Sequence, residues 1–177
     1  MKPALLFLCL LLPVAALAQP GPPRVFISPS GEPFHDGASA EGGFEVWFAR
    51  VDANHDGRID REEFRADAMR YFKVLDTNGD GVIDGFEIAA YEKSVAPELD
   101  IGGQGFARDG AARAGVAALL SEPEPVSGAD VNLDSRITLA EWLAATDRRF
   151  DMLDPKHLGY LTHDGLKALM PKAGKGR

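Results

Sequence analysis

Residues 52–87 read DANHDGRIDREEFRADAMRYFKVLDTNGDGVIDGFE, and they decide the fold because one twelve-residue pattern both opens and closes this stretch. In each copy, side chains with oxygen atoms stand at positions 1, 3, 5 and 9, glycine stands at position 6, and glutamate stands at position 12. Oxygen donors at alternate positions, around a turn that glycine permits, point inward around a cation of calcium's size. The stretch therefore predicts two metal-binding loops.

The predicted ligands occupy the same six positions in both loops. They are Asp52, Asn54, Asp56, Arg58, Asp60 and Glu63 in the first loop, and Asp76, Asn78, Asp80, Val82, Asp84 and Glu87 in the second. Position 7 contributes its backbone carbonyl, position 9 binds directly or through water, and the glutamate at position 12 binds with both oxygens. Acidic turns that bind nothing are the alternative, but two full matches in tandem rarely arise by chance at average residue usage.

A third copy of the pattern, DVNLDSRITLAE at residues 130–141, keeps all the ligand positions. Its predicted ligands are Asp130, Asn132, Asp134, Arg136, Thr138 and Glu141. Ser135 stands where glycine is expected, and a residue other than glycine with a positive φ costs on the order of 1 kcal/mol. We therefore expect this loop to bind metal more weakly than the first two.

A fourth copy, DPKHLGYLTHDG at residues 154–165, keeps Asp154, Gly159, Leu161 and Thr162 but has lost the ligands at positions 3, 5 and 12. Lys156 and Leu158 replace the oxygen donors at positions 3 and 5, and Gly165 replaces the closing glutamate. Because a lysine cation and a missing carboxylate both oppose cation binding, we expect this loop to be structural only.

The four loops resemble those of the EF-hand (calmodulin) superfamily. The resemblance implies an all-α fold of helix–loop–helix repeats that bind Ca²⁺, with two to three ions held by the loops just described, and with short β-bridges between loops. The spacing of the loops also resembles that of lanmodulin, a periplasmic lanthanide-binding EF-hand protein. The chain departs from that family in having Asn at position 3 of all three good loops and no proline at position 2 of any of them.

The spacing of the loops constrains how they pair. Loops one and two begin 24 residues apart, as do loops three and four, so only twelve residues separate successive loops. One shared helix must then leave one loop and enter the next, and loops at opposite ends of a helix do not pair easily. Each loop has an apolar residue at position 8, the β-bridge position: Ile59, Ile83, Ile137 and Leu161. We expect the second loop to pair with the third and the first with the fourth.

The first residues of the chain have the features of a signal peptide. Lys2 precedes an apolar run over residues 4–17, and Ala16, Leu17 and Ala18 match the pattern that signal peptidase cleaves. A membrane anchor is the alternative, but the run is shorter than the roughly 20 residues that a spanning helix needs. We predict residues 1–18 to be a signal peptide, cleavage after Ala18, and export to the periplasm or the exterior.

The remaining chain divides by composition. Residues 19–43 are rich in Pro and Gly and predict a mostly extended arm, with a short strand at residues 25–28. Residues 44–93 and 126–170 are predicted to hold the first and second pairs of EF hands. Residues 94–125 predict a linker with one helix over about 106–120, and Pro123 and Pro125 should interrupt the helix that enters the third loop. Residues 171–177 predict a disordered tail.

Composition narrows the function. The chain has 27 acidic against 19 basic residues, which disfavours nucleic acid and anionic membranes as partners. No residue pattern predicts a catalytic site, and the one cysteine, Cys9, lies in the signal peptide, so we expect no enzyme. We expect a calcium buffer or a calcium-stabilised module whose partners are calcium ions, with any protein partner unidentified. The alternatives are a periplasmic lanthanide-binding protein and a calcium sensor, although the few methionines disfavour a sensor.

Overall fold

The computed structural model describes residues 25–34, 40–95, 116–120, 122 and 124–170. The elements in chain order are β1 (Val25–Ile27), β2 (Pro33–Phe34), α1 (Ala40–Val51), β3 (Arg58–Asp60), α2 (Arg61–Leu75), β4 (Val82–Asp84), α3 (Gly85–Ala90), the π-helix η1 (Tyr91–Val95), β5 (Val116–Ala118), the 3₁₀ helix η3 (Ser127–Ala129), β6 (Arg136–Thr138), α4 (Leu139–Leu153), β7 (Tyr160–Thr162) and α5 (His163–Leu169). None of the helices among these residues is long and apolar enough to cross a membrane.

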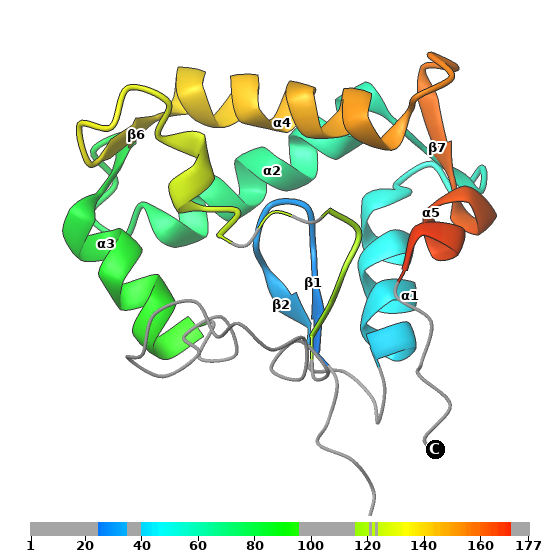
Figure 1. The fold of residues 1–177 in the computed structure, drawn as a ribbon, viewed down its shortest axis with the longest axis horizontal. Helices are drawn as coiled ribbons and strands as arrows, with labels where there is room; N and C mark the ends of the chain where they lie inside the picture. The colour runs from blue at the N-terminus through cyan, green and yellow to red at the C-terminus, as the bar shows by residue number, and fades with distance from the viewer. Residues whose placement is uncertain (1–24, 35–39, 96–115, 121, 123, 171–177) are drawn as a thin grey trace, which may run out of the picture.

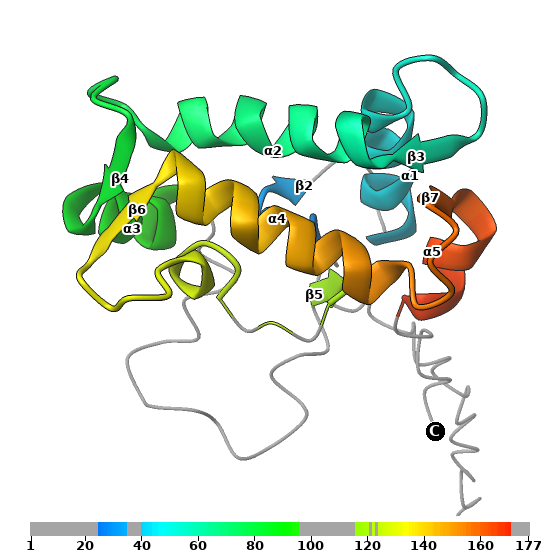
Figure 2. The same ribbon diagram turned by 90° about the horizontal axis from the view of Figure 1, so that it is seen from above.

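Helices α2 and α4 are the shared helices that the loop spacing predicts. Each has 15 residues because it begins inside its loop, at position 10, and continues to the residue before the next loop. Figure 2 shows the two helices lying side by side. The indole nitrogen of Trp142 on α4 donates a hydrogen bond of 2.8 Å to the carbonyl oxygen of Ala68 on α2. Because the loops pair at both ends of the two helices, α2 and α4 run antiparallel.

The strands between the loops confirm the predicted crossed pairing. Strand β3 of the first loop pairs antiparallel with β7 of the fourth, with Ile59 opposite Leu161. Strand β4 of the second loop pairs antiparallel with β6 of the third, with Ile83 opposite Ile137. We call these the first–fourth end and the second–third end of the molecule, which lie at opposite ends of α2 and α4 (Figure 1).

The two hydrophobic cores follow the two ends and mix both halves of the chain. The core at the first–fourth end includes Phe44, Trp47, Phe64, Phe150 and Leu166. The core at the second–third end includes Tyr71, Phe72, Ile83, Ile137 and Trp142. Residues 44–93 and 126–170 are therefore repeats in sequence but not separate structural units, since each core needs side chains from both.

The described part of the predicted arm, residues 25–34 and 40–43, is not an extended linker but contributes to the core, and the short strand predicted at residues 25–28 is confirmed as β1. Strands β1 and β2 form an antiparallel hairpin, β5 joins β1 in parallel, and helix α1 already begins at Ala40. The Phe26 side chain is fully buried, and its ring lies 5.7 Å from that of Phe44 and 5.6 Å from that of Trp47. Gly43 lets α1 approach this closely, because a Cβ atom there would lie 2.8 Å from the Phe26 Cβ atom.

Three other expectations are corrected or limited by the structure. The fold is not purely helical, because it contains the three-stranded sheet β2-β1-β5 and the two short loop sheets. Residues 116–118, expected at the end of a helix, form strand β5, whose pairing with β1 outweighs the helix preference of alanine. Residues 119 and 120 are not helical either, while residues 106–115 of that helix, the signal peptide and the tail at 171–177 lie outside the described residues. The interruption before the third loop is confirmed, since among the described residues just before that loop the one helix is the one-turn η3.

Candidate metal-binding site

All four loops adopt one backbone shape, whether or not they keep the ligands. Positions 4 and 6 have positive φ in every loop: His55 and Gly57, Gly79 and Gly81, Leu133 and Ser135, and His157 and Gly159. Ser135 takes the left-handed conformation, with φ of 62°, that the sequence required of it. Sequence reasoning missed position 4, where three of the four residues are not glycine.

The aspartate at position 1 of each loop holds this shape. The Asp52 carboxylate accepts hydrogen bonds from the backbone N–H groups of Asp56 at 3.0 Å and Gly57 at 2.9 Å. Asp76, Asp130 and Asp154 accept the corresponding pairs in their loops. In the first and fourth loops these residues, Asp52 and Asp154, are buried, each with 6% of its surface exposed. Position 1 therefore organises the loop even where positions 3, 5 and 12 have lost their ligands.

Positions 3 and 5 aim their oxygens in the same way in the three intact loops. In the first loop the Asn54 side-chain oxygen accepts from the N–H of Asp56 at 2.8 Å, and the Asp56 carboxylate accepts from the N–H of Arg58 at 2.9 Å. The second and third loops repeat both bonds. Since an ionised carboxylate has about four acceptor sites, these bonds leave oxygen capacity for a cation.

The closing glutamate distinguishes the third loop from the first two. One oxygen of Glu63 accepts from the N–H groups of Ala53 and Asn54 at 3.1 and 3.2 Å, and the other accepts from that of Asp60 at 3.1 Å. Glu87 joins the start and end of the second loop in the same way. For Glu141 the structure gives bonds to Thr138 alone, at the end of its loop. The third loop is thus less completely closed.

Position 9 also begins the helix that leaves the loop. The Asp60 side chain accepts from the N–H of Glu63 at 2.9 Å while Glu63 accepts from the N–H of Asp60, which forms a capping box at the start of α2. Asp84 and Thr138 form the same box for α3 and α4. The spacing Asp-x-x-Glu is the sequence signal for this second role, which the ligand pattern alone does not reveal.

The fold changes the acidity of Glu87, the closing ligand of the second loop. Burial alone would raise the pKa of this carboxyl, but hydrogen bonds from the N–H of Asp84 and from the Thr77 hydroxyl hold the pKa below its ordinary value. Glu87 is therefore ionised at neutral pH, as a cation ligand must be.

The donor set fits a hard divalent cation, although the side chains must still move to bind one. Each of the first three loops carries six oxygen-bearing positions, and oxygen is the ligand atom that Ca²⁺ prefers. Among the described residues no three His, Cys, Asp or Glu side chains yet converge closely enough to hold a metal ion. The glutamate at position 12 must exchange its N–H partners for the ion. The assignment of individual ligands stays a prediction.

The fold and the loops define a helix–loop–helix protein whose turns present oxygen ligands. Residues 44–69 and 69–90 match the family model of the EF hand, so the first two repeats are EF hands of the calcium-binding type. The match covers loops one and two, and the assignment of loops three and four rests on their sequence and geometry. No curated protein matches the chain significantly.

Proposed function

We propose that this protein binds Ca²⁺ as a buffer or a calcium-stabilised module after export, and that it is not an enzyme. Three divalent ions would reduce the net charge of the chain without residues 1–18 from about −9 to about −3. Each ion also stabilises the folded state, by about 2.7 kcal/mol when the free ion is at a hundred times its Kd.

The hairpin β1–β2 supports a buffer or module over a sensor. A calcium sensor opens an apolar groove between its helices for a target. Here Phe26 and Phe34 belong to the core formed with Phe44 and Trp47 of α1. Glu32 at the hairpin turn forms an ion pair with Arg50 of α1 at 2.7 Å and another with Arg70 of α2. In Figure 1 the hairpin lies beside α1 and below α2, so the chain's own residues, Phe26 and Phe34, pack against α1.

Calorimetric titration of the protein with calcium, magnesium and lanthanum tests the proposal. We expect three calcium ions, with the third loop weakest, and a weak response to magnesium because Mg²⁺ demands a smaller octahedral site. Absence of calcium binding would refute the proposal. A preference for lanthanum large enough to exclude calcium in the cell would establish the lanthanide-binding alternative instead.

Dye binding separates the buffer from the sensor. A dye that fluoresces on apolar surface should respond little to calcium if the hairpin stays in place. A large calcium-dependent increase would favour the sensor. A variant with Phe26→Ser, which removes a fully buried ring, gives the positive control for an exposed inner face.

Export has its own test. The lysine, the apolar run and the Ala-Leu-Ala pattern of residues 16–18 support cleavage after Ala18. Mass spectrometry of the protein recovered from outside the cytoplasm should give a chain that begins at Gln19. Recovery of the intact chain in the cytoplasm would contradict export.

A further inference from the structure

We infer that this protein associates head to tail with further copies of itself, through an apolar knob and an apolar groove on opposite sides of the second–third end, and that calcium promotes the contact. The knob consists of the side chains of Phe86, Val131 and Leu133. The groove lies beside Leu139, between the second loop and the start of α4. The calcium dependence rests on the proposed function, whereas the shape of the two surfaces does not.

The knob consists of large apolar side chains that the fold leaves in solvent. Phe86, in the first turn of α3, is 88% exposed, Leu133 is 85% exposed, and Val131 is more than half exposed. A Cβ atom on Gly85, the residue before Phe86, would lie 3.9 Å from the Ser135 carbonyl oxygen. Leu133 is two residues from Ser135, so the two most exposed side chains emerge on the same side of the loop pair.

The backbone of Leu133 indicates that its side chain does not serve the fold. Its φ is 60°, a left-handed conformation that favours Gly and Asn, and the corresponding residue of the second loop is Gly79. A leucine in this conformation costs on the order of 1 kcal/mol. Since the side chain is almost fully exposed, little burial within the chain offsets this cost. A partner that buries the side chain would offset it.

The groove is an apolar surface that the chain leaves partly open. It has a volume of about 370 Å³, and Met69, Phe72 and Leu139 form its apolar walls. Gly79 and Gly81 of the second loop also line it, and they have no side chains that would close it. Met69 and Leu139 are both more than a third exposed. An aromatic side chain that enters the groove therefore contacts apolar walls from both shared helices.

The antiparallel strands β4 and β6 place the knob and the groove on opposite sides of the loop pair. Strand β4 ends beside the beginning of β6, so Phe86, just after β4, and Leu133, just before β6, share one side. Leu139 follows β6 and Gly81 precedes β4 on the other side, about 10 Å away along the three-residue ladder. A knob therefore does not reach the groove of its own molecule. Complementary surfaces at different places on one molecule give a head-to-tail contact between copies.

Charge makes this contact depend on calcium. The second and third loops carry four and three ligand carboxylates, of which Asp76 lines the groove and Asp134 is next to Leu133. Without ions these charges repel the next copy, and two calcium ions reduce the charge of the seven carboxylates from −7 to −3. Lys73, which also lines the groove, can then attract the acidic side of the knob. Both loops are already hydrogen-bonded and paired without an ion, so the cation changes their charge and not their fold.

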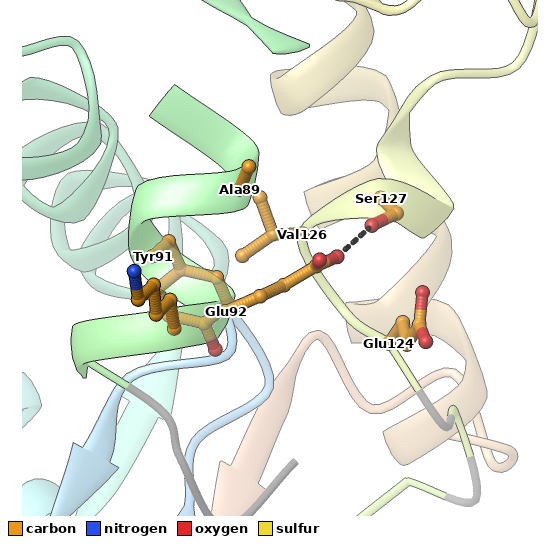
Figure 3. Close-up of a pocket in the computed structure, with 7 residues that line it drawn as sticks. Ala89, Tyr91, Glu92, Glu124, Val126 and Ser127 are labelled. Carbon is orange, nitrogen blue, oxygen red and sulfur yellow. Dashed lines mark hydrogen bonds between the residues drawn. The ribbon is translucent and has the colours of Figure 1, made fainter. Parts of the chain in front are cut away.

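A second cavity at this end is a poorer fit for the knob. It also has a volume of about 370 Å³, lies between η1 and η3, and has Glu92, Lys93 and Glu124 in its lining. A hydrogen bond of 3.2 Å from the Ser127 hydroxyl to the Glu92 carboxylate crosses it (Figure 3). An apolar ring that entered this cavity would remove water from charged groups, which is unfavourable. This cavity therefore supplies the control site for the experiment.

Sedimentation velocity tests the contact at protein concentrations from about 10 µM to 1 mM, because interfaces of a few side chains bind weakly. With calcium, the average sedimentation coefficient should rise continuously with protein concentration. In a chelator it should stay near that of the monomer, and about 0.5 M salt should restore part of the association by screening the repulsion. A protein that binds calcium and stays monomeric at every concentration overturns the inference.

Surface variants locate the contact. The double variant Phe86→Ser, Leu133→Asn removes the knob, and asparagine suits the left-handed backbone at residue 133. The variant Met69→Lys places a charge in the groove. Each should weaken association by about tenfold or more and still bind the parent number of calcium ions, since none of the three residues is a predicted ligand. Glu92→Gln, in the second cavity, should associate like the parent. A knob variant that associates normally contradicts the assignment.

A mixture of the two variants distinguishes a head-to-tail contact from a symmetric one. The knob variant keeps its groove and the groove variant keeps its knob, so together they should form a one-to-one dimer that grows no further. A mixture that stays monomeric overturns the head-to-tail contact. Binding of the parent to phosphatidylcholine–phosphatidylserine vesicles, in place of self-association, would assign the knob to a membrane surface instead. If calorimetry detects no calcium binding, the proposed function fails, and association in chelator with salt still decides whether the contact exists.

Discussion

The two ends of this molecule share one loop backbone but differ in what keeps the loops folded. At the first–fourth end, one loop of the pair has a full set of ligands. The pair is supported by hydrogen bonds to Asp154, by the contact between α1 and α5, and by a hairpin in the core. At the second–third end, both loops carry ligands and their flanks are the short α3 and the one-turn η3. The difference teaches that the shape of such a loop and its capacity for metal are separable properties of the sequence.

The largest expected effect on calcium affinity comes from removing a closing glutamate, and it tests whether the two ends differ. In Glu87→Gln a neutral amide replaces the carboxylate, and we expect the second site to weaken by about 100-fold, or about 2.7 kcal/mol. Through β4 and β6 the third site should weaken as well, by a smaller factor. Calorimetric titration measures both.

The matched control for this variant is Glu63→Gln. It should weaken the first site by a similar factor and leave the other two unchanged, because the fourth loop has no site to lose. Equal weakening of all three sites in either variant would show that the two ends are not independent.

A second prediction compares two aspartates at position 1. Asp154→Ala leaves the part-buried N–H groups of Leu158 and Gly159 without acceptors, so the calcium-free protein should lose about 1–2 kcal/mol of unfolding free energy. Asp130→Ala breaks the equivalent bonds in an exposed loop, where water replaces them, and should cost under about 0.5 kcal/mol.

Urea unfolding in a calcium chelator measures both losses. Asp154→Ala should keep three calcium ions, whereas Asp130→Ala should keep two. Similar losses of stability for the two variants would contradict a special role for the fourth loop.

A third prediction concerns the left-handed residue at position 6. Ser135→Gly should relieve a positive φ and strengthen the third site by about 1 kcal/mol, roughly fivefold in affinity. The reverse change Gly57→Ser should weaken the first site by a similar amount, since a Cβ atom there meets nothing within 4 Å and only backbone strain is added. Calcium titration gives both values, and an unchanged third site would mean that Ser135 does not limit it.

The smallest expected effect is on the pH dependence of stability, through the ion pairs between the shared helices α2 and α4. A hydrogen bond from Arg65, with a weaker contribution from Arg61, holds the pKa of Asp147 below its ordinary value despite partial burial. Because the pKa of Asp147 is lower in the folded protein than in the unfolded chain, where it is near 3.9, the ion pairs stabilise the fold above that pH. This stabilisation is lost as the pH falls through the pKa of the folded protein. The variant Asp147→Asn should therefore lose under about 1 kcal/mol of unfolding free energy at pH 6. The difference in stability between the two proteins should disappear as the pH falls below about 4.

Salt gives the control for that pH effect. Both arginines are more than a third exposed, so about 0.5 M salt should shrink the difference between the two proteins. A difference that persists in acid would assign the effect to packing and not to the ion pair.

The loops and their pairing could be predicted from sequence because their determinants are local. Ligands, glycines and the residue at position 8 recur at fixed spacing, and the 24-residue interval leaves crossed pairing as the geometric solution. The match at residues 44–90 agrees with the part of this prediction that it covers. The backbone at position 4 was missed because His55, Leu133 and His157 do not look like left-handed residues.

The strand at residues 25–28 was predicted, but its partners β2 and β5 were not, and what places them lies partly far away in the sequence. Phe26 and Phe34 flank a Ser-Pro-Ser-Gly turn, which is a local hairpin signal. Their burial nevertheless depends on α1, and β1 also pairs with strand β5, about 90 residues later. Likewise, pairing with β1 turned an alanine-rich stretch into a strand.

The crossed pairing also has a consequence for the order in which the chain folds. Ile59 finds its strand partner at Leu161, about 100 residues further on, whereas the second and third loops join residues about 54 apart. Closing long loops is slow, so the first calcium loop, although complete in sequence early, completes its native sheet only when nearly the whole chain is present.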